Sequence, residues 1–208
     1  MANQNAPFGF NEYFGGTGGA PTFANVRMRA ASSAGAIFFG DPVMPVIGTA
    51  NGYIVQAAPG TTALAGIFVG CTYLSTAMKR RVWSNYWPGS DTAYDVECYV
   101  VNDPDAQFVV QGNSTTFNIS GTSGAWTSSP IGQYAQFAIG SGNTANGISG
   151  AYLNSLGTTV TFPFIVRDLI TSPPGAPGSD PNTAYNWVVV GFNNALTRSN
   201  GAGPVGIS

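Results

Sequence analysis

Short apolar runs rich in strand-favouring residues recur along most of the chain, and clusters of turn-forming residues separate them. Two examples are Tyr53–Gln56 and Asn186–Phe192, in which β-branched and aromatic residues dominate, and such residues favour strands. Runs of this kind recur about every 8–12 residues, a spacing typical of β-barrels and β-sandwiches. We therefore predict an all-β fold with little helix.

Clusters of Gly, Pro, Asn and Asp mark where the predicted strands begin and end, because these residues favour turns. Ala151–Leu156 is a stretch that we consider for one or two helical turns. The predicted strands cover residues 36–39, 43–47, 53–56, 64–73, 94–101, 106–111, 158–166 and 186–192.

The same pattern divides the chain into an arm and a body. Residues 1–22 have neither a helical nor a strand period but hold several aromatic residues among glycines. We predict an extended N-terminal arm, disordered in the free protein, that orders against a partner. Residues 23–208 form a single β-rich domain in this interpretation. Within it, about residues 112–150 are rich in Ser, Thr, Gly and Asn and predict a loop-rich insertion or projecting lobe.

The charge of the chain is unusually low. Only 8% of the residues are charged and none is histidine, whereas 44% are hydrophobic; soluble domains typically carry about 25% charged residues. A weakly charged surface favours association with other proteins. The absence of histidine excludes a Ser-His-Asp triad within the chain and removes the commonest metal ligand. We predict a structural protein, not an enzyme, with no cofactor and no metal site.

Two groups of acidic residues nevertheless allow a chemical interpretation. Asp95 and Glu97 lie two positions apart and point to one face of a strand, as paired carboxylates of a glycosidase would; the solvent-exposed face of a half-buried strand is the interpretation that we favour. Asp103 and Asp105 flank Pro104. They suit a hard cation such as Ca²⁺, but they suit a tight turn better.

Lys79, Arg80 and Arg81 form the only basic cluster, and aromatic residues follow them. Proteins that bind single-stranded nucleic acid interleave charges and rings in this way, but they carry a net basic face, whereas this chain has a net charge of −2. We predict contact with an acidic protein neighbour, or a plain solvated loop, and no direct binding of nucleic acid.

The cysteines and the hydropathy of the chain indicate in which cellular compartment the protein is made. Cys71 and Cys98 lie in apolar strand patterns, which predicts buried free thiols in a reducing compartment, with a disulfide as the alternative. No secretory signal is recognisable at the N-terminus. The longest apolar runs, residues 34–39 and 63–71, are far shorter than the ~20 residues of a membrane span. We expect synthesis in a cytoplasm and no association with a membrane.

Six segments of the chain form a familiar series, namely Met1–Phe10, Phe39–Val43, Leu64–Gly70, Asn102–Phe108, Ser149–Leu153 and Asn186–Val190. In this order, along nearly the whole chain, they resemble structural proteins of tailed-bacteriophage virions, namely the family of head decoration or capsid cement proteins. In addition, Gly40–Val43 followed by Leu64–Val69 is similar to the β-tulip barrels of phage decoration proteins.

The resemblance implies a β-tulip-like body and a function as a cement protein. Such a protein binds the outer surface of the icosahedral head as a homotrimer and stabilises the shell that the major capsid protein forms. It is assembled into the virion in the cytoplasm of the bacterial host. The residues that we expect to contact the capsid are Phe8, Phe10, Tyr13, Phe14, Lys79, Arg80 and Arg81.

An alternative function belongs to the class of binding proteins. The chain would then be an adhesin or head fibre on the virion surface that recognises glycans through a platform of aromatic residues. The candidate platform residues are Trp83, Tyr86, Trp87 and Trp126.

Overall fold

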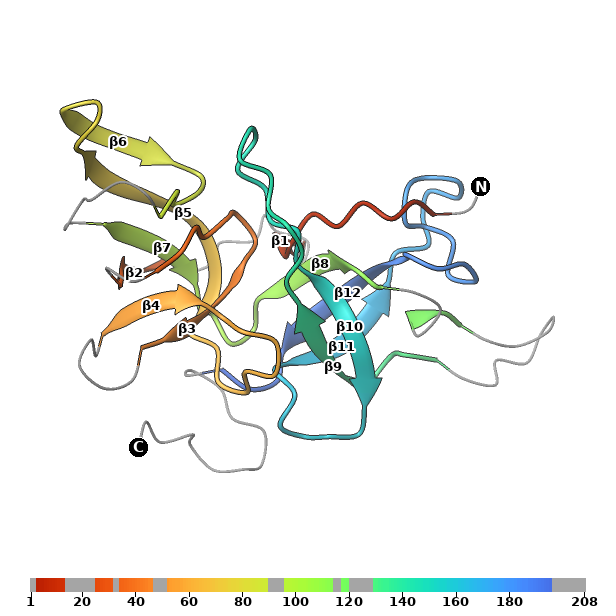
Figure 1. The fold of residues 1–208 in the computed structure, drawn as a ribbon. Coiled ribbons are helices and arrows are strands. Elements are labelled where there is room, and N and C mark those ends of the chain that lie inside the picture. Colours follow the sequence, from red (N-terminus) through yellow and green to blue (C-terminus); the bar gives the residue numbers. More distant parts are fainter. Residues whose placement is uncertain are drawn as a thin grey trace.

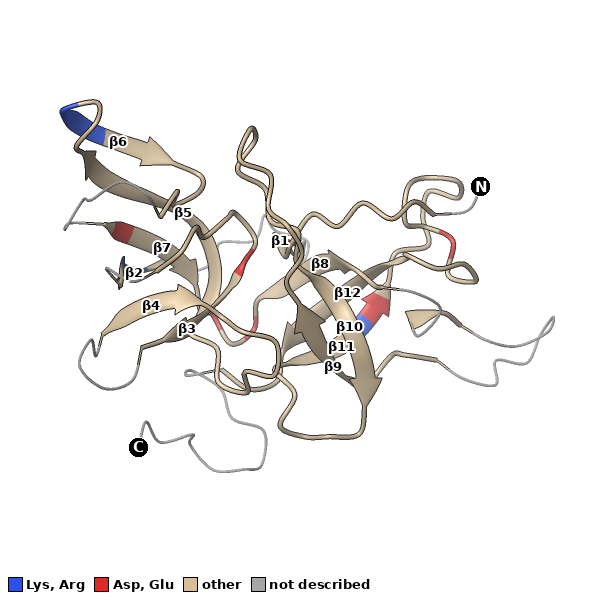
Figure 2. Cartoon of the chain, in the orientation of Figure 1, with Lys and Arg blue, Asp and Glu red and all other residues tan. Residues whose placement is uncertain are grey.

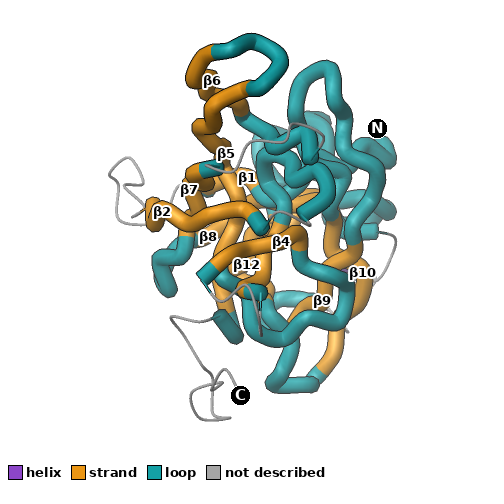
Figure 3. Tube along the Cα trace, turned by 60° about the vertical axis from the view of Figure 1, so that its left-hand side comes forward, coloured by secondary structure: helices purple, strands orange, loops and turns teal. Residues whose placement is uncertain are grey.

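The computed structural model describes residues 3–13, 25–31, 34–46, 52–89, 96–113, 117–119 and 129–195. This part of the chain consists of strands, turns and loops without an α-helix (Figures 1 and 3). The predicted all-β class is therefore confirmed. Phe14, Asp95 and Trp126 lie outside the described residues.

The first structural unit is a closed β-barrel, drawn at the left of Figure 1. Its ring runs β3-β4-β2-β7-β5 among the described strands and closes because β3 also pairs with β5. The barrel is mixed, since β2 and β4 run parallel. Strand β6 pairs only with β5 in the described sheet and extends the ring outward as a hairpin. The bounds are β2 Asn25–Ala30, β3 Pro42–Pro45, β4 Tyr53–Gln56, β5 Gly66–Ser75, β6 Arg80–Ser84 and β7 Glu97–Val101.

The second unit is an antiparallel sheet, drawn at the right of Figure 1. Its described strands follow the order β1-β8-β12-β11-β9-β10. The sheet curls, because a bridge between Gly112 and Leu153 joins the end of β8 to β10. The bounds are β1 Asn11–Glu12, β8 Gln107–Gln111, β9 Tyr134–Ala138, β10 Tyr152–Gly157, β11 Phe164–Leu169 and β12 Trp187–Phe192.

Each unit has its own hydrophobic core. The barrel encloses a core around Ile37, Ile54 and Phe68, whereas the second sheet packs around stacked phenylalanines that include Phe164 and Phe192. The cores approach each other at β5, because Ile67 belongs to the core of the second sheet although its strand is part of the barrel. Burial of apolar surface therefore stabilises both units and the contact between them.

The N-terminal segment packs on the body, in contrast to the disordered arm expected for the free protein. Strand β1 adds to the edge of the second sheet, with Asn11 opposite Val109. Phe10 is only 1% exposed and stacks on Phe164 with ring centroids 4.5 Å apart. Residues 3–13 thus belong to the fold. Phe10 cannot contact a capsid, because its ring lies in the core.

The expected insertion is partly integral to the second sheet. Strand β9 lies between β11 and β10, and its Ala135 and Phe137 are fully buried. The loop that follows β9 reaches the barrel, where Ile148 bridges Phe39. The described residues 129–150 therefore join the two units and do not form a separate lobe.

Three other local predictions differ from the structure. Ala151–Leu156, considered for helical turns, contains most of strand β10, because pairing with β9 determines its backbone. The strand predicted over residues 158–166 begins only at Phe164. Residues 36–39 make isolated bridges at Ile37 and Phe39 and no continuous strand. In each case tertiary pairing outweighs the local pattern.

A buried carboxylate lies where the two units meet. Asp41 is 1% exposed and accepts hydrogen bonds from the Phe38 backbone N–H at 2.8 Å, Gln56 Nε2 at 2.6 Å and Ser149 Oγ at 2.5 Å. Burial raises the pKa of Asp41 above its ordinary value, because desolvation outweighs these three hydrogen bonds. Asp41 thus links the loop before β3 to the loop after β9.

The backbones of the same region approach closely enough to require glycine. Gly40 has φ +86°, and a Cβ atom on it would lie 2.9 Å from the backbone nitrogen of Phe10. That nitrogen donates to the Gly40 carbonyl at 2.9 Å. Any larger residue would push the N-terminal segment away from the barrel.

Candidate attachment face

The outer face of the barrel carries most of the basic residues of the described chain. Side chains alternate along β2, so that Met28 packs against the barrel core while Arg27 and Arg29 point outward. The same alternation on β6 leaves Arg81 and Trp83 exposed. We give the name attachment face to the outer side of these strands, with Arg27, Arg29, Arg81, Leu74 and Trp83, together with the tip of the β5–β6 hairpin, with Met78, Lys79 and Arg80. Arg80 lies opposite Ser75, so its side chain leaves β6 on the other side from Arg81.

The strand register brings these residues together. Trp83 of β6 lies opposite Thr72 of β5, Thr72 lies opposite Glu97 of β7, and Glu97 lies opposite Arg29 of β2. Arg81 lies opposite Leu74, two residues further along the β5–β6 hairpin and on the same side as Trp83. A row of side chains therefore crosses four adjacent strands, although the residues are far apart in sequence.

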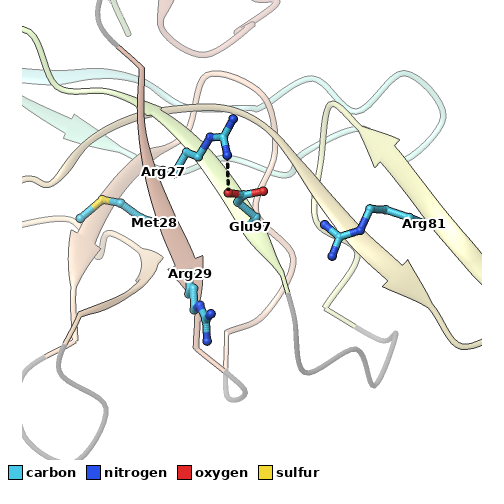
Figure 4. A pocket seen from close by; sticks show the side chains of 5 residues that line it. All are labelled: Arg27, Met28, Arg29, Arg81 and Glu97. Carbon is cyan, nitrogen blue, oxygen red and sulfur yellow. Dashed lines mark hydrogen bonds and ion pairs between the residues drawn. The ribbon is translucent and has the colours of Figure 1, made fainter.

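Glu97 organises the centre of this face. Its Oε1 accepts a hydrogen bond from Arg27 Nη1 at 3.2 Å, and its Oε2 accepts one from Thr72 Oγ1 at 3.4 Å. The Arg27 guanidinium lies 5.9 Å from the centroid of the Tyr99 ring, within range of a cation–π contact. Figure 4 shows Glu97 between Arg27 on one side and Arg81 on the other.

These side chains line a shallow pocket of about 190 Å³ that opens on the attachment face. Arg27, Arg29 and Arg81 contribute three guanidinium groups, and Glu97 is the only acidic lining residue among those described. Guanidinium groups bind carboxylates in a bidentate manner. The pocket is therefore suited to an acidic group of a partner protein.

Large hydrophobic side chains are exposed beside the basic ones. Six such side chains are exposed in the described part of the chain, and three of them, Leu74, Met78 and Trp83, lie on the β5–β6 hairpin. Trp83 is 65% exposed, and its ring lies over Gly70 of the neighbouring strand. Trp, Met and Arg are enriched in the buried centres of protein interfaces.

Charge is segregated between the two units. Of the six Lys and Arg residues that the structure describes, five lie on the attachment face, and the sixth is Arg167 on β11. The described acidic residues of the second unit are Glu12, Asp103, Asp105, Asp168 and Asp180. Figure 2 shows the basic cluster at the start of β6, far from the acidic residues of the second unit.

The sequence-predicted contact residues are divided between the units. Lys79, Arg80 and Arg81 lie at the tip of the β5–β6 hairpin, where the turn holds Lys79 at φ 54°. Phe8 and Tyr13 are half-buried on the second sheet. Only the basic cluster therefore belongs to the attachment face.

The aromatic platform proposed for an adhesin does not exist as one surface. Trp87 is 4% exposed, because its ring packs edge-on against Tyr73 in the barrel core. Tyr86 stacks on Phe38 with ring centroids 5.5 Å apart. Trp83, by contrast, is exposed. The described members Trp83, Tyr86 and Trp87 therefore do not form the expected platform, and Trp126 lies outside the described residues.

The other candidate sites have structural explanations. The backbone N–H of Asp105 donates to Asp103 Oδ1 at 2.9 Å, which confirms the predicted turn. Glu97 is ion-paired with Arg27, as expected for the outer face of a strand. The described residues contain no group of three or more metal-ligating side chains close enough to hold an ion.

Cys71 and Cys98 are buried free thiols, which confirms that prediction. They lie opposite each other on β5 and β7. Burial raises the pKa of Cys98 to about 12 and shifts that of Cys71 in the same direction. Both residues therefore serve as small core residues and not as nucleophiles.

Sequence reasoning missed Arg27 and Arg29. Strand β2 was not predicted, although Val26, Met28 and Ala30 alternate with the two arginines. That alternation is the signal that identifies an amphipathic strand. Its hydrophobic side is weak, because alanine and methionine favour strands less than valine or isoleucine.

Comparison of the chain with protein-family models, with curated proteins and with solved structures found no match. A search of the described part of the chain for helices that could span a bilayer found none. The geometry of the chain and its sequence pattern therefore carry the functional inference.

Proposed function

We propose that the protein is a structural protein of a bacteriophage head, a cement protein that binds the outer surface of the shell through its attachment face. The observation that carries this proposal is that exposed Leu74, Met78 and Trp83 lie with five basic residues on the outer side of the barrel and the tip of its β5–β6 hairpin, in a weakly charged molecule. Isolated exposed hydrophobic residues are ordinary, but a cluster marks an interaction surface.

The two kinds of side chain have different roles in binding. The apolar residues of the β5–β6 hairpin supply the buried centre of the interface, where tryptophan and arginine contribute most of the binding free energy. The arginines around Glu97 select an acidic partner surface and accelerate its encounter. Attachment through such a face weakens as salt increases, because ions screen the charges.

The identity of the partner follows from the resemblance described for the sequence. We propose the major capsid protein as the partner and a homotrimer as the bound form. Three attachment faces held in one trimer bind far more tightly than one, since each further contact is intramolecular. The proposal requires neither a metal, a cofactor nor a catalytic step.

The experiment uses phage heads assembled without this protein, to which the purified full-length chain is added. The variants Arg80→Ser/Arg81→Ser and Trp83→Ala should each weaken binding by about tenfold or more, the scale of an interface hot spot. Arg167→Ser and Val160→Ala are matched controls, because both residues are exposed outside the attachment face. They should bind as the wild-type chain does.

Two results would contradict the proposal. One is the absence of the protein from purified virions. The other is binding of the attachment-face variants to the heads at wild-type occupancy and with wild-type salt dependence.

A further inference from the structure

A second surface hollow lies on the other unit, where the N-terminal segment crosses the second sheet. It has a volume of about 590 Å³, within the range of about 300–1,000 Å³ that is usual for ligand pockets. We call it the aromatic pocket. Its lining residues are Phe8, Asn11, Tyr13, Val109, Ile170, Ser172 and Trp187.

The pocket is built by tertiary structure and is held firmly. Val109 of β8 lies opposite Asn11 of β1 in the sheet. The backbone N–H of Tyr13 donates to the Gln107 carbonyl at 2.8 Å. Further toward the N-terminus, Gln111 Nε2 donates to the Gln4 carbonyl at 2.7 Å. The N-terminal wall of the pocket is therefore fixed before any ligand arrives.

The aromatic side chains are also held in place. Phe8 meets Trp187 edge-to-face, with ring centroids 4.9 Å apart and planes at 68°. Gly178 packs against the indole of Trp187, and a Cβ atom added to Gly178 would lie only 2.1 Å from Trp187 Cγ. The Trp187 backbone N–H donates to the Gly178 carbonyl at 2.9 Å. Such rigid rings bind a ligand with little loss of conformational entropy.

The chemistry of the lining restricts the class of ligand. None of the described lining residues is charged, so the pocket offers no ion pair to an anion or a cation. Aromatic rings present a negative face that attracts the polarised C–H groups of a sugar ring. The Asn11 amide and the Ser172 hydroxyl both donate and accept hydrogen bonds, as neighbouring sugar hydroxyls require.

From this combination we infer that the aromatic pocket binds a neutral carbohydrate. The inference is independent of the attachment face, because the pocket belongs to the second sheet and not to the barrel. If the barrel holds the protein on a shell, the aromatic pocket lies on the other unit, away from the attachment face.

The experiment is a glycan array that contains neutral and acidic oligosaccharides, probed with the purified full-length protein. Titration calorimetry then measures the affinity of each neutral oligosaccharide that binds. Tyr13→Ala and Trp187→Ala should each weaken that affinity by about tenfold or more, since stacking residues are hot spots. Asn11→Ala tests how much the amide side chain contributes to the affinity for the oligosaccharide, at a position outside the core.

Trp83→Ala is the matched control, because Trp83 is exposed on the attachment face and should leave glycan binding unchanged. Far-ultraviolet circular dichroism confirms that each variant is folded. If Trp187→Ala does not fold, Tyr13→Ala and Asn11→Ala still decide the question.

Three outcomes would overturn the inference. The first is that no neutral oligosaccharide binds at millimolar concentration. The second is that only acidic glycans bind and that Arg80→Ser/Arg81→Ser abolishes the binding, which would assign it to the attachment face. The third is that Tyr13→Ala and Asn11→Ala bind neutral glycans as the wild-type chain does. None of these outcomes depends on whether the protein attaches to a phage head.

Discussion

Truncation of Phe10 should strongly destabilise the protein, although this residue belongs to a segment that the sequence predicts to be a flexible arm. Phe10 is 1% exposed and contacts the rings of Phe108 and Phe164. A buried phenylalanine removes about 150–250 Å² from water, worth about 4–6 kcal/mol at ~25 cal/mol per Å². The unfolded chain already buries part of this surface, so we expect Phe10→Ala to lower the free energy of unfolding by about 3–5 kcal/mol.

Phe8 provides a matched control two residues earlier in the same segment. Its ring is half-buried against Trp187, so Phe8→Ala should lower the free energy of unfolding by only about 1.5–2.5 kcal/mol, half of the loss expected for Phe10→Ala. Urea titrations followed by tryptophan fluorescence measure both variants. With a denaturant slope of about 2 kcal/mol per M, the midpoint of Phe10→Ala should fall by about 2 M.

The comparison between the two variants decides the question. Equal losses for Phe8→Ala and Phe10→Ala, or a loss below about 1.5 kcal/mol for Phe10→Ala, would refute the placement of Phe10 in the core. If Phe10→Ala does not fold, Phe10→Leu should show a smaller loss in the same direction, because leucine retains part of the buried surface.

Three further predictions concern the joint between the units and the barrel core. The pKa of Asp41 is raised by burial, so the folded chain keeps a proton that the unfolded chain releases above about pH 4. The contribution of Asp41 to the free energy of unfolding therefore falls as pH rises through the raised pKa. Asp41→Asn should reduce this pH dependence in urea titrations between about pH 4 and pH 8. Gly40→Ala should destabilise the protein by at least about 1 kcal/mol more than Gly60→Ala, as measured by thermal unfolding of the two variants. An alanine in a left-handed backbone costs about 1–2 kcal/mol at either position, but only at Gly40 is there no space for the added Cβ atom. Cys71 and Cys98 should resist a thiol reagent at about pH 8 in the folded protein and react once it is unfolded in urea, since burial raises the pKa of both thiols; rapid modification of the folded protein would contradict this.

The strands that the sequence predicts well have strong and continuous apolar patterns. Tyr53–Gln56 and Trp187–Phe192 appear at nearly their predicted bounds. Strand β2 was missed because its hydrophobic side consists of Val26, Met28 and Ala30, a pattern too weak to stand out. Strand β10 was missed because Ala151–Leu156 is also compatible with a helix, and only its pairing with β9 decides the backbone conformation.

The candidate sites show the same division. The basic cluster Lys79–Arg81 is contiguous in sequence and is therefore recognisable from the sequence alone. Arg27 and Arg29 join it only because β7 and β5 lie between β2 and β6 in the sheet. The aromatic pocket had no sequence signal, since Phe8, Val109 and Trp187 come from three distant segments.

The sequence by itself determined the all-β class and the turn at Asp103, because these depend on apolar runs, composition and short-range hydrogen bonds. Tertiary structure alone decided that Phe10 enters the core, that Asp41 joins the two units and that the arginines share one face. Those features depend on strand order and register, which arise from the simultaneous burial of distant apolar residues. No local pattern along the chain specifies which distant strands become neighbours.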